Sequence, residues 1–190
     1  VNHYTANKRL RSNDAYTAGG KAGFRPDRTV KTYTQILKRL YPHVPVVVGG
    51  IEASLRRLTH YDYWDERLMP SLLVDSGADL LVYGMGEKVI QEVASAMRNG
   101  FNAKLLRRLR QVAFVADRAY VDRLDEEQTI RLHSYEECCR DKQAFAENFT
   151  RIETLSNLME QTQTLVEPTG DRYVVVNPPH TTLTQSELDR

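Results

Sequence analysis

The sequence predicts an α/β fold, in which helices pack on a small, doubly wound parallel sheet. Two observations predict it. Short apolar runs in VPVVVGG and ADLLVYG each end in glycine, as buried parallel strands commonly do. Helical and extended patterns also alternate with short connections, which is typical of parallel strands joined by crossover helices. Only three such strands are expected in residues 1–119, so the sheet should be incomplete, with its first strands upstream of Val1 in a longer protein.

The individual elements of the first part follow from periodicity and from proline and glycine positions. Residues 1–25 are polar and contain scattered glycines and basic side chains, so they are expected to form a loop. Pro26 opens a helical apolar pattern that Pro42 ends. The expected elements are a helix over 27–41, a strand over 44–48, a helix over 63–76 that Pro70 kinks, a strand over 79–83, helices over 87–99 and 103–109, and a weaker strand over 112–116.

The character of the chain changes from residue 120, and we expect a second segment over 120–190. It begins with an acidic linker, VDRLDEEQTIRLHSYEE, and continues as one long helix over 134–163. The tetrapeptide PTGD predicts a turn, and a strand over 172–176 ends at NPP. Thr184 and Glu187 form a capping box at the start of a further helix. The segment therefore leads towards a part of the protein beyond Arg190.

Composition narrows the functional classes. No apolar run is long enough to cross a bilayer, and no signal peptide is visible, so a soluble cytoplasmic protein without a membrane partner is expected. The cysteines are Cys138 and Cys139 alone, and adjacent thiols do not match the spacing of zinc or iron–sulfur ligands. No metal site is expected in this chain.

Charge is distributed unevenly along the chain. Residues 1–120 carry 19 Lys and Arg against 11 Asp and Glu, which gives +8, whereas residues 121–190 carry 7 against 14, which gives −7. A basic first part could bind nucleic acid or a phosphate-bearing cofactor, but a solvated basic surface is the commoner explanation. Nucleic acid is therefore possible as a partner but not favoured.

Polar and glycine-rich loops follow the first two predicted strands. Because the carboxyl ends of parallel strands meet at one edge, these loops should form one rim, where ligands of open α/β sheets bind. Glycines would allow backbone N–H groups to approach a ligand closely. This strand-end rim comprises Gly49, Gly50, Glu52, Gly84, Gly86 and Glu87. A dinucleotide site is not favoured, because Val89 stands where the fingerprint requires a third small residue.

The stretch SLRRLTHYDYWDE after the first strand adds further candidate side chains. Its two arginines could hold a phosphate or carboxylate, or could pair with neighbouring acids. Its histidine and acids match no helical metal-ligand spacing. Its aromatics could stack on bases or serve as packing anchors. The candidates are Arg56, Arg57, His60, Tyr61, Tyr63 and Trp64.

Several stretches of the chain resemble one known family. YTANKRLRSNDAYT, RPDRT, VPVVVGGIEASLRRLTHYDYW and ADLLVYGMGEK closely resemble the YgiQ-like family of radical SAM proteins, and GDRYVVVNPP resembles the segment just before that family's radical SAM core. VVVGG and GMGE are also similar to strand-end motifs of Rossmann-like, cobalamin-binding-like domains. The Asp-x-His-x-x-Gly cobalamin-ligand motif does not occur in the sequence.

The resemblance implies a longer enzyme that binds a 4Fe-4S cluster through CxxxCxxC and cleaves S-adenosylmethionine, starting a radical reaction on an unknown substrate. These 190 residues contain no CxxxCxxC motif, so no catalytic residue or cofactor is expected here. We expect an N-terminal accessory piece whose rim faces the missing catalytic barrel. In it, Arg56 and Arg57 would be anion or interface contacts, Tyr61, Tyr63 and Trp64 packing anchors, and Glu52 and Glu87 acceptors of backbone N–H groups. A nucleic-acid-binding module and an ordinary nucleotide-binding domain remain as alternatives.

Overall fold

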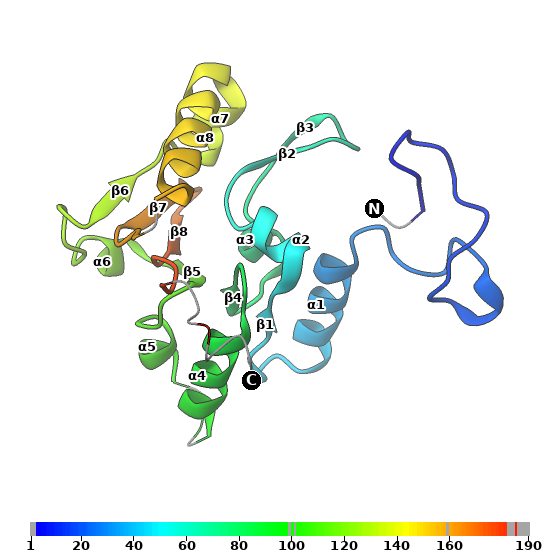
Figure 1. The fold of residues 1–190 in the computed structure, drawn as a ribbon, viewed down its shortest axis with the longest axis horizontal. Coiled ribbons are helices and arrows are strands. Elements are labelled where there is room, and N and C mark those ends of the chain that lie inside the picture. The colour runs from blue at the N-terminus through cyan, green and yellow to red at the C-terminus, as the bar shows by residue number, and fades with distance from the viewer. Residues whose placement is uncertain (1–2, 99, 101, 159, 182–184, 186–190) are drawn as a thin grey trace.

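A computed structural model of the chain describes residues 3–98, 100, 102–158, 160–181 and 185 (Figure 1). One six-stranded sheet runs through the molecule in the order β1–β4–β5–β8–β7–β6, and a two-stranded hairpin, β2–β3, stands apart from it. The strands are β1 Val47–Val48, β2 His60–Asp62, β3 Arg67–Met69, β4 Leu80–Val82, β5 Val112–Ala116, β6 Thr129–Arg131, β7 Thr164–Thr169 and β8 Arg172–Val176.

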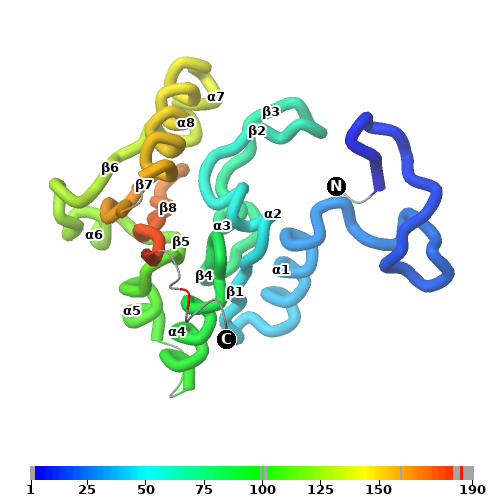
Figure 2. Tube along the Cα trace, viewed as in Figure 1, coloured from blue at the N-terminus to red at the C-terminus, as the bar shows by residue number. Residues whose placement is uncertain are grey.

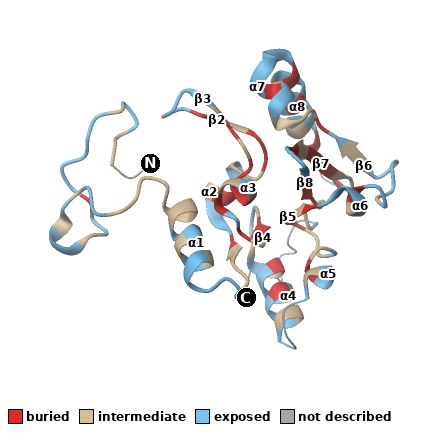
Figure 3. Cartoon of the chain, turned by 180° about the vertical axis from the view of Figure 1, so that it is seen from behind, coloured by how far each residue is buried: buried red, intermediate tan, exposed pale blue. Residues whose placement is uncertain are grey.

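Helices cover both faces of the sheet, which confirms the predicted α/β class and its Rossmann-like layers, while the missing strands stay a prediction. On one face, Leu81 of β4 shares a core with Leu73 and Leu155 of two helices. On the other face, Leu80 packs with Val89. Buried residues accordingly line the strands and the inward sides of the helices (Figure 3). The helices are α1 Thr29–Leu40, α2 Gly50–Leu55, α3 Leu72–Ser76, α4 Glu87–Met97, α5 Ala103–Leu106, α6 Arg118–Val121, α7 Tyr135–Arg140 and α8 Lys142–Ser156.

Strand directions agree with the prediction at the first two strands and differ at the third. β1 and β4 pair in parallel, as expected. β5 is the predicted strand over 112–116, but it runs antiparallel to β4. The reason is that the chain leaves the sheet at the end of β4, passes through α4 and α5, and enters β5 at the same end of the sheet. There the Gln111 side chain donates to the carbonyl oxygens of Tyr83 and Met85. β8 runs antiparallel to both of its neighbours, β5 and β7, whereas β6 is parallel to β7.

The predicted helix over 63–76 is wrong for most of its length. Residues 60–69 form the β2–β3 hairpin instead, because the Asp62 carboxylate accepts the N–H groups of Trp64 and Asp65 and so closes a turn. Pro70 does not kink a helix but precedes one. Ser71 caps α3, its hydroxyl accepting the N–H of Leu73.

The predicted helix over 134–163 is two shorter helices. α7 ends at Arg140. The extended backbone of the next residue, Asp141, breaks the helical path, and its carboxylate caps α8. Beyond α8, β7 occupies 164–169, and β6 lies within the predicted acidic linker. The sequence pattern also missed α2 and α6, and it extended the helix over 103–109 past Leu106, where α5 ends. Thr184 and Glu187, the predicted capping box, lie outside the described residues.

The two segments of the chain contribute to the same sheet. β8, from the second segment, pairs with β5 of the first, while the boundary at residue 119 stays a prediction. The N-terminal loop follows an irregular path beside α1, with a short 3-10 turn at Ala18–Gly20 (Figure 2). Within the described residues, no helix is both long and apolar enough to reach across a bilayer.

Candidate functional site

The strand-end rim is assembled by the parallel pairing of β1 and β4. Gly49 and Gly50 follow β1, and Gly84 and Gly86 follow β4. The two loops are joined by a hydrogen bond, in which the N–H of Gly84 donates to Ser54 Oγ over 2.9 Å. Gly49 lies so close to β4 that a Cβ there would be 3.3 Å from the Val82 carbonyl oxygen. Gly50 and Gly84 have positive φ angles of 84° and 67°, which glycine adopts without strain.

The acids of the rim lie in different surroundings. Glu52 accepts a hydrogen bond from Arg56 Nη1 at 3.1 Å, one turn along α2. Glu87 is the first residue of α4 and is exposed. Their predicted role as acceptors of backbone N–H groups stays a prediction.

Arg56 belongs to a compact ion-pair network under the hairpin. Its Nη2 lies 3.8 Å from Asp62 Oδ2, and Arg28 pairs with both Asp62 and Asp65. Burial alone would raise the pKa of Asp62. The hydrogen bonds from Arg28 and from the Asp65 and Trp64 N–H groups outweigh it and lower that pKa well below its ordinary value. Arg56 therefore already faces two carboxylates.

The aromatic side chains of the hairpin contact the N-terminal loop. Trp64 lies against Tyr4, with ring centroids 5.4 Å apart, and Tyr63 meets Trp64 edge-on at 5.6 Å. Lys8 Nζ lies 4.6 Å from the Tyr63 ring centroid and pairs with Glu66. Tyr61 is more than half exposed. The hairpin thus carries an aromatic surface that the first residues of the chain partly cover.

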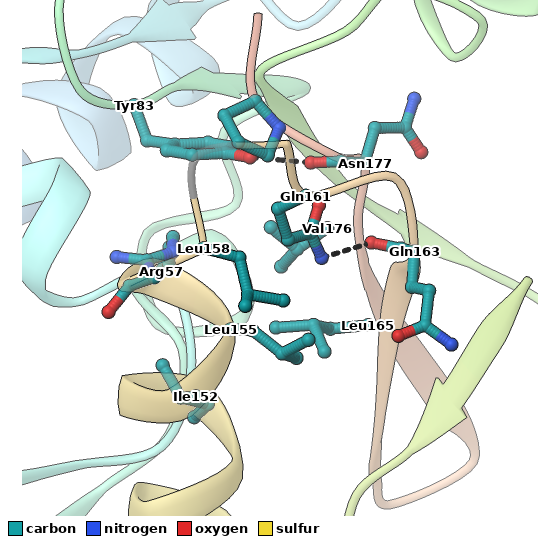
Figure 4. Close-up of a pocket in the computed structure, with 12 residues that line it drawn as sticks. Arg57, Tyr83, Ile152, Leu155, Leu158, Gln161, Gln163, Leu165, Val176 and Asn177 are labelled. Carbon is teal, nitrogen blue, oxygen red and sulfur yellow. Dashed lines mark hydrogen bonds between the residues drawn. The ribbon is translucent and has the colours of Figure 1, made fainter. Parts of the chain in front are cut away.

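Arg57 differs from its neighbour in lying between two hollows. Figure 4 shows the first, a space of 280 Å³ in which Arg57 and Tyr83 face the apolar side chains Leu155 and Leu165. The second, of 390 Å³, lies between the chain over 55–61 and α8. We call this second hollow the Arg57 cleft. The first hollow lies beside the ends of β4 and β8, whereas Glu167 of β7 lines the second, and Arg57 and Ile152 line both.

Arg57 is half-buried, and its guanidinium is incompletely paired. Nη1 donates to the Ser54 carbonyl oxygen at 2.6 Å, and the group lies 5.0 Å from the Tyr83 ring centroid. Nε is buried and has no hydrogen-bond partner among the described residues. In the same described part of the chain, no carboxylate lies within ion-pair distance of Arg57. Burial consequently lowers the pKa of Arg57.

Glu167 of β7 is the acid that the sequence pattern missed. Its side chain is 1% exposed, and its two carboxylate oxygens lie 3.0 and 3.1 Å from the Thr59 N–H that they accept. Burial raises the pKa of Glu167 to about 7. A signal was present, because TLVEPT places one acid in an apolar, β-branched run just before a turn. Burial likewise lowers the pKa of His60, which also lines the Arg57 cleft.

Comparison with known proteins places the chain in a family. The family model described as Radical SAM N-terminal matches residues 1–190. The chain belongs to this family. UPF0313 proteins from Porphyromonas gingivalis, Bacteroides thetaiotaomicron and Clostridium perfringens are 47%, 48% and 46% identical to it, each over the whole chain. The chain spans 30%, 32% and 28% of their respective lengths, or about a third. No solved structure matches the chain.

Membership of a radical SAM family raises the question of whether these residues could hold a 4Fe-4S cluster. Cys138 is buried, its Sγ lies 3.3 Å from Asn148 Nδ2, and burial raises the pKa of its thiol to about 11. Cys139 is exposed and adjacent, so the two thiols cannot supply the three spaced thiolates that such a cluster needs. Among the residues that the structure describes, no group of three metal-ligating side chains comes together. The residues of this chain do not fit the cluster.

Proposed function

We propose that this chain is the N-terminal accessory part of a radical SAM enzyme and that its strand-end rim packs against the catalytic part of the same polypeptide. Three features support the proposal. The family model matches the whole chain, the relatives are about three times longer, and the residues here do not fit the iron–sulfur cluster. In the full-length protein, the cluster and S-adenosylmethionine would supply the radical chemistry from outside this chain.

The observation that carries the packing proposal is a group of exposed apolar side chains at the rim. Ile51 and Leu55 of α2 are 81% and 71% exposed, and Met85, in the loop after β4, is 63% exposed. Apolar side chains gathered on one edge commonly mark a contact surface. Because they flank the glycine loops of β1 and β4, a partner seated on them would also cover the rim.

The alternative of nucleic-acid binding has less support than the accessory role, although the first part of the chain is basic. Several of its basic side chains are paired with carboxylates of the same region, as in Lys31–Asp75 and Lys38–Asp79. Those charges are therefore partly neutralised before any partner arrives. Strongly salt-dependent binding of RNA or DNA by the chain would nevertheless favour that alternative, and saturable binding of NAD, FAD or ATP would favour a nucleotide-binding domain.

The proposal is tested in the protein encoded by the whole reading frame. We expect a CxxxCxxC motif after Arg190, and 5′-deoxyadenosine formation after anaerobic cluster reconstitution. The double substitution Ile51→Glu and Leu55→Glu should reduce that formation by about tenfold, because charged side chains would be forced into a buried contact. In the 190-residue chain, the same substitutions should leave the circular dichroism spectrum unchanged, because both side chains are exposed there.

Phe24→Glu is the matched control, since Phe24 is 72% exposed but lies in the N-terminal loop. It should leave product formation unchanged. A reading frame without CxxxCxxC would refute the radical SAM assignment. Full activity in the Ile51→Glu and Leu55→Glu double variant would refute the packing of the rim.

A further inference from the structure

We propose that the Arg57 cleft binds a small organic acid and that Arg57 receives its carboxylate. The inference does not depend on the packing of the strand-end rim. It rests on three properties of the cleft: an unpaired edge of the half-buried Arg57 guanidinium, a balance of charge suited to a monoanion, and an apolar wall.

The unpaired edge of Arg57 fixes the kind of group that is bound. Nη1 is used by the Ser54 carbonyl oxygen, whereas the buried Nε has no partner among the described residues. Nε and Nη2 form one side of the planar guanidinium, and this side matches the two oxygens of a carboxylate. Glu153 of the same lining acts on Arg57 without forming an ion pair, so a ligand carboxylate that binds the free edge directly stabilises this arrangement.

The other polar groups of the cleft favour a monoanion over a phosphate dianion. Arg57 is the permanent cation of the lining, whereas Glu153 lies exposed on α8 and Glu167 lies buried beneath. A second negative charge on the ligand would meet these carboxyl groups with no second cation to offset it. Thr59 Oγ1 is also buried without a partner in the described structure, and it offers a hydrogen bond to a hydroxyl group of the ligand.

The remaining lining suits an apolar body. Phe145, Phe149 and Ile152 of α8 face Leu55 and Leu58 across the cleft. Its volume of 390 Å³ lies in the range of small-molecule sites, which are mostly apolar with a few convergent polar groups. An aromatic or aliphatic monocarboxylic acid, with or without one hydroxyl, therefore fits the cleft best.

Isothermal titration calorimetry on the 190-residue chain tests the proposal. The probes are hexanoate, phenylacetate and 4-hydroxyphenylacetate, compared with phenylacetamide and inorganic phosphate. We expect at least one acid to bind, and the neutral amide and phosphate to bind at least about tenfold more weakly, as expected for loss of a buried charge-assisted pair. Absence of binding by all three acids, or tighter binding of phosphate, would overturn the proposal.

Variants assign the binding to Arg57. Arg57→Gln should weaken the best acid by about tenfold or more, and Arg57→Lys, which keeps the charge but loses the two-donor edge, should weaken it too. The matched control is Arg39→Gln, because Arg39 is exposed in the last turn of α1 and should not affect binding.

A measurement on the wild-type chain keeps the test valid if the Arg57 variants do not fold. In ¹⁵N-correlated NMR spectra, the acid should shift the amide signals of Thr59 and His60 and leave those of α1 in place. Shifts that avoid the cleft, or undiminished affinity in folded Arg57→Gln, would refute the assignment.

Discussion

Two buried acids of this molecule show how surroundings set the state of a carboxyl group. Asp62 is 2% exposed and Glu167 is 1% exposed, so both lose most of their hydration. Hydrogen bonds from the Arg28 guanidinium and two backbone N–H groups replace the lost water around the Asp62 carboxylate, and the pKa of Asp62 falls. Glu167 is hydrogen-bonded to Thr59 and has no ion-pair partner among the described residues, and its pKa rises to about 7 because of burial. Burial without a cation thus leaves Glu167 half protonated near neutral pH.

This difference makes Glu167 a source of pH-dependent stability. Its pKa is 4.5 in the unfolded chain and about 7 in the folded protein, so the folded state holds the proton more tightly. The contribution of Glu167 to the free energy of unfolding is fully present below pH 4.5. It is lost as the pH rises to 7, and the whole loss amounts to about 3 kcal/mol. Glu167→Gln should abolish this loss, because the amide oxygen still accepts the Thr59 N–H and never ionises.

Urea unfolding at half-unit intervals from pH 5 to 8 measures the effect. The free energy of unfolding of the wild type should fall relative to that of Glu167→Gln across this window. Glu153→Gln, which changes an exposed acid of the same cleft, should follow the wild type. Parallel curves for wild type and Glu167→Gln would show that Glu167 titrates as an ordinary glutamate.

At the level of elements, the sequence predicted those helices and strands that a pattern within their own residues specifies. α1, α4 and β5 fall within or on their predicted bounds, because an apolar period or a β-branched run specifies each one. The hairpin was missed because its turn depends on Asp62, which Arg28 holds from 34 residues away. β6 was missed because it becomes a strand only beside β7, far along the chain. β7 was missed although it forms a hairpin with β8 around the predicted PTGD turn.

The residues of the candidate site also fall into those that the sequence could place and those that it could not. The four rim glycines could be placed together, since parallel pairing of β1 and β4 requires it. Arg56 and Arg57 looked equivalent in sequence, yet one is paired with acids and the other is buried beside a cleft. Glu167 reaches this cleft from 108 residues away, so no local pattern could place it there.

Gln111 joins the loop after β4 to the segment after β8, a contact that the sequence did not predict. Its Nε2 donates to the carbonyl oxygens of Tyr83 and Met85 at 2.7 and 2.5 Å, and its Oε1 accepts the His180 N–H at 3.2 Å. Gln111→Ala should lower the free energy of unfolding by about 2–3 kcal/mol, because it leaves partly buried backbone groups without partners. It should also speed amide hydrogen exchange in the loop between β4 and α4.

Gln35→Ala is the control for this prediction. Gln35 also donates to a carbonyl oxygen, that of Asp75, but the bond is exposed, so its loss should cost less than about 1 kcal/mol. Urea unfolding and hydrogen exchange monitored by mass spectrometry give both readouts. Equal losses in the two variants would mean that Gln111 does not fasten the β4–α4 loop.

At the scale of the whole molecule, one sheet unites a basic first part with an acidic second part. The β5–β8 pairing joins the two, and β1 and β6 form the ends of the sheet. In the described part of the chain, β1 has a neighbour on one side only, β4. Unpaired strand edges are normally covered, charged or shortened, because they invite further pairing.

The outer edge of β1 is therefore where we predict a further strand in a longer form of this protein. Leu37 and Tyr41 of α1 are exposed, and together with Val44 and Val46 they line an apolar hollow of 260 Å³ beside β1. A strand that pairs with β1 would cover these side chains as well as the free backbone edge. Relatives about three times as long have ample sequence to supply it.

Hydrogen exchange compares the 190-residue chain with the product of the whole reading frame. Exchange of the amides of β1, Val47–Val48, should be at least about tenfold slower in the longer protein, because a paired edge must open before exchange occurs. Amides of β8 are the control, since this strand lies between β5 and β7 in both forms and should keep its rate. Equal rates for the two β1 amides would show that β1 remains an edge strand, and that the hollow beside α1 is covered by something other than a paired strand or left open to water.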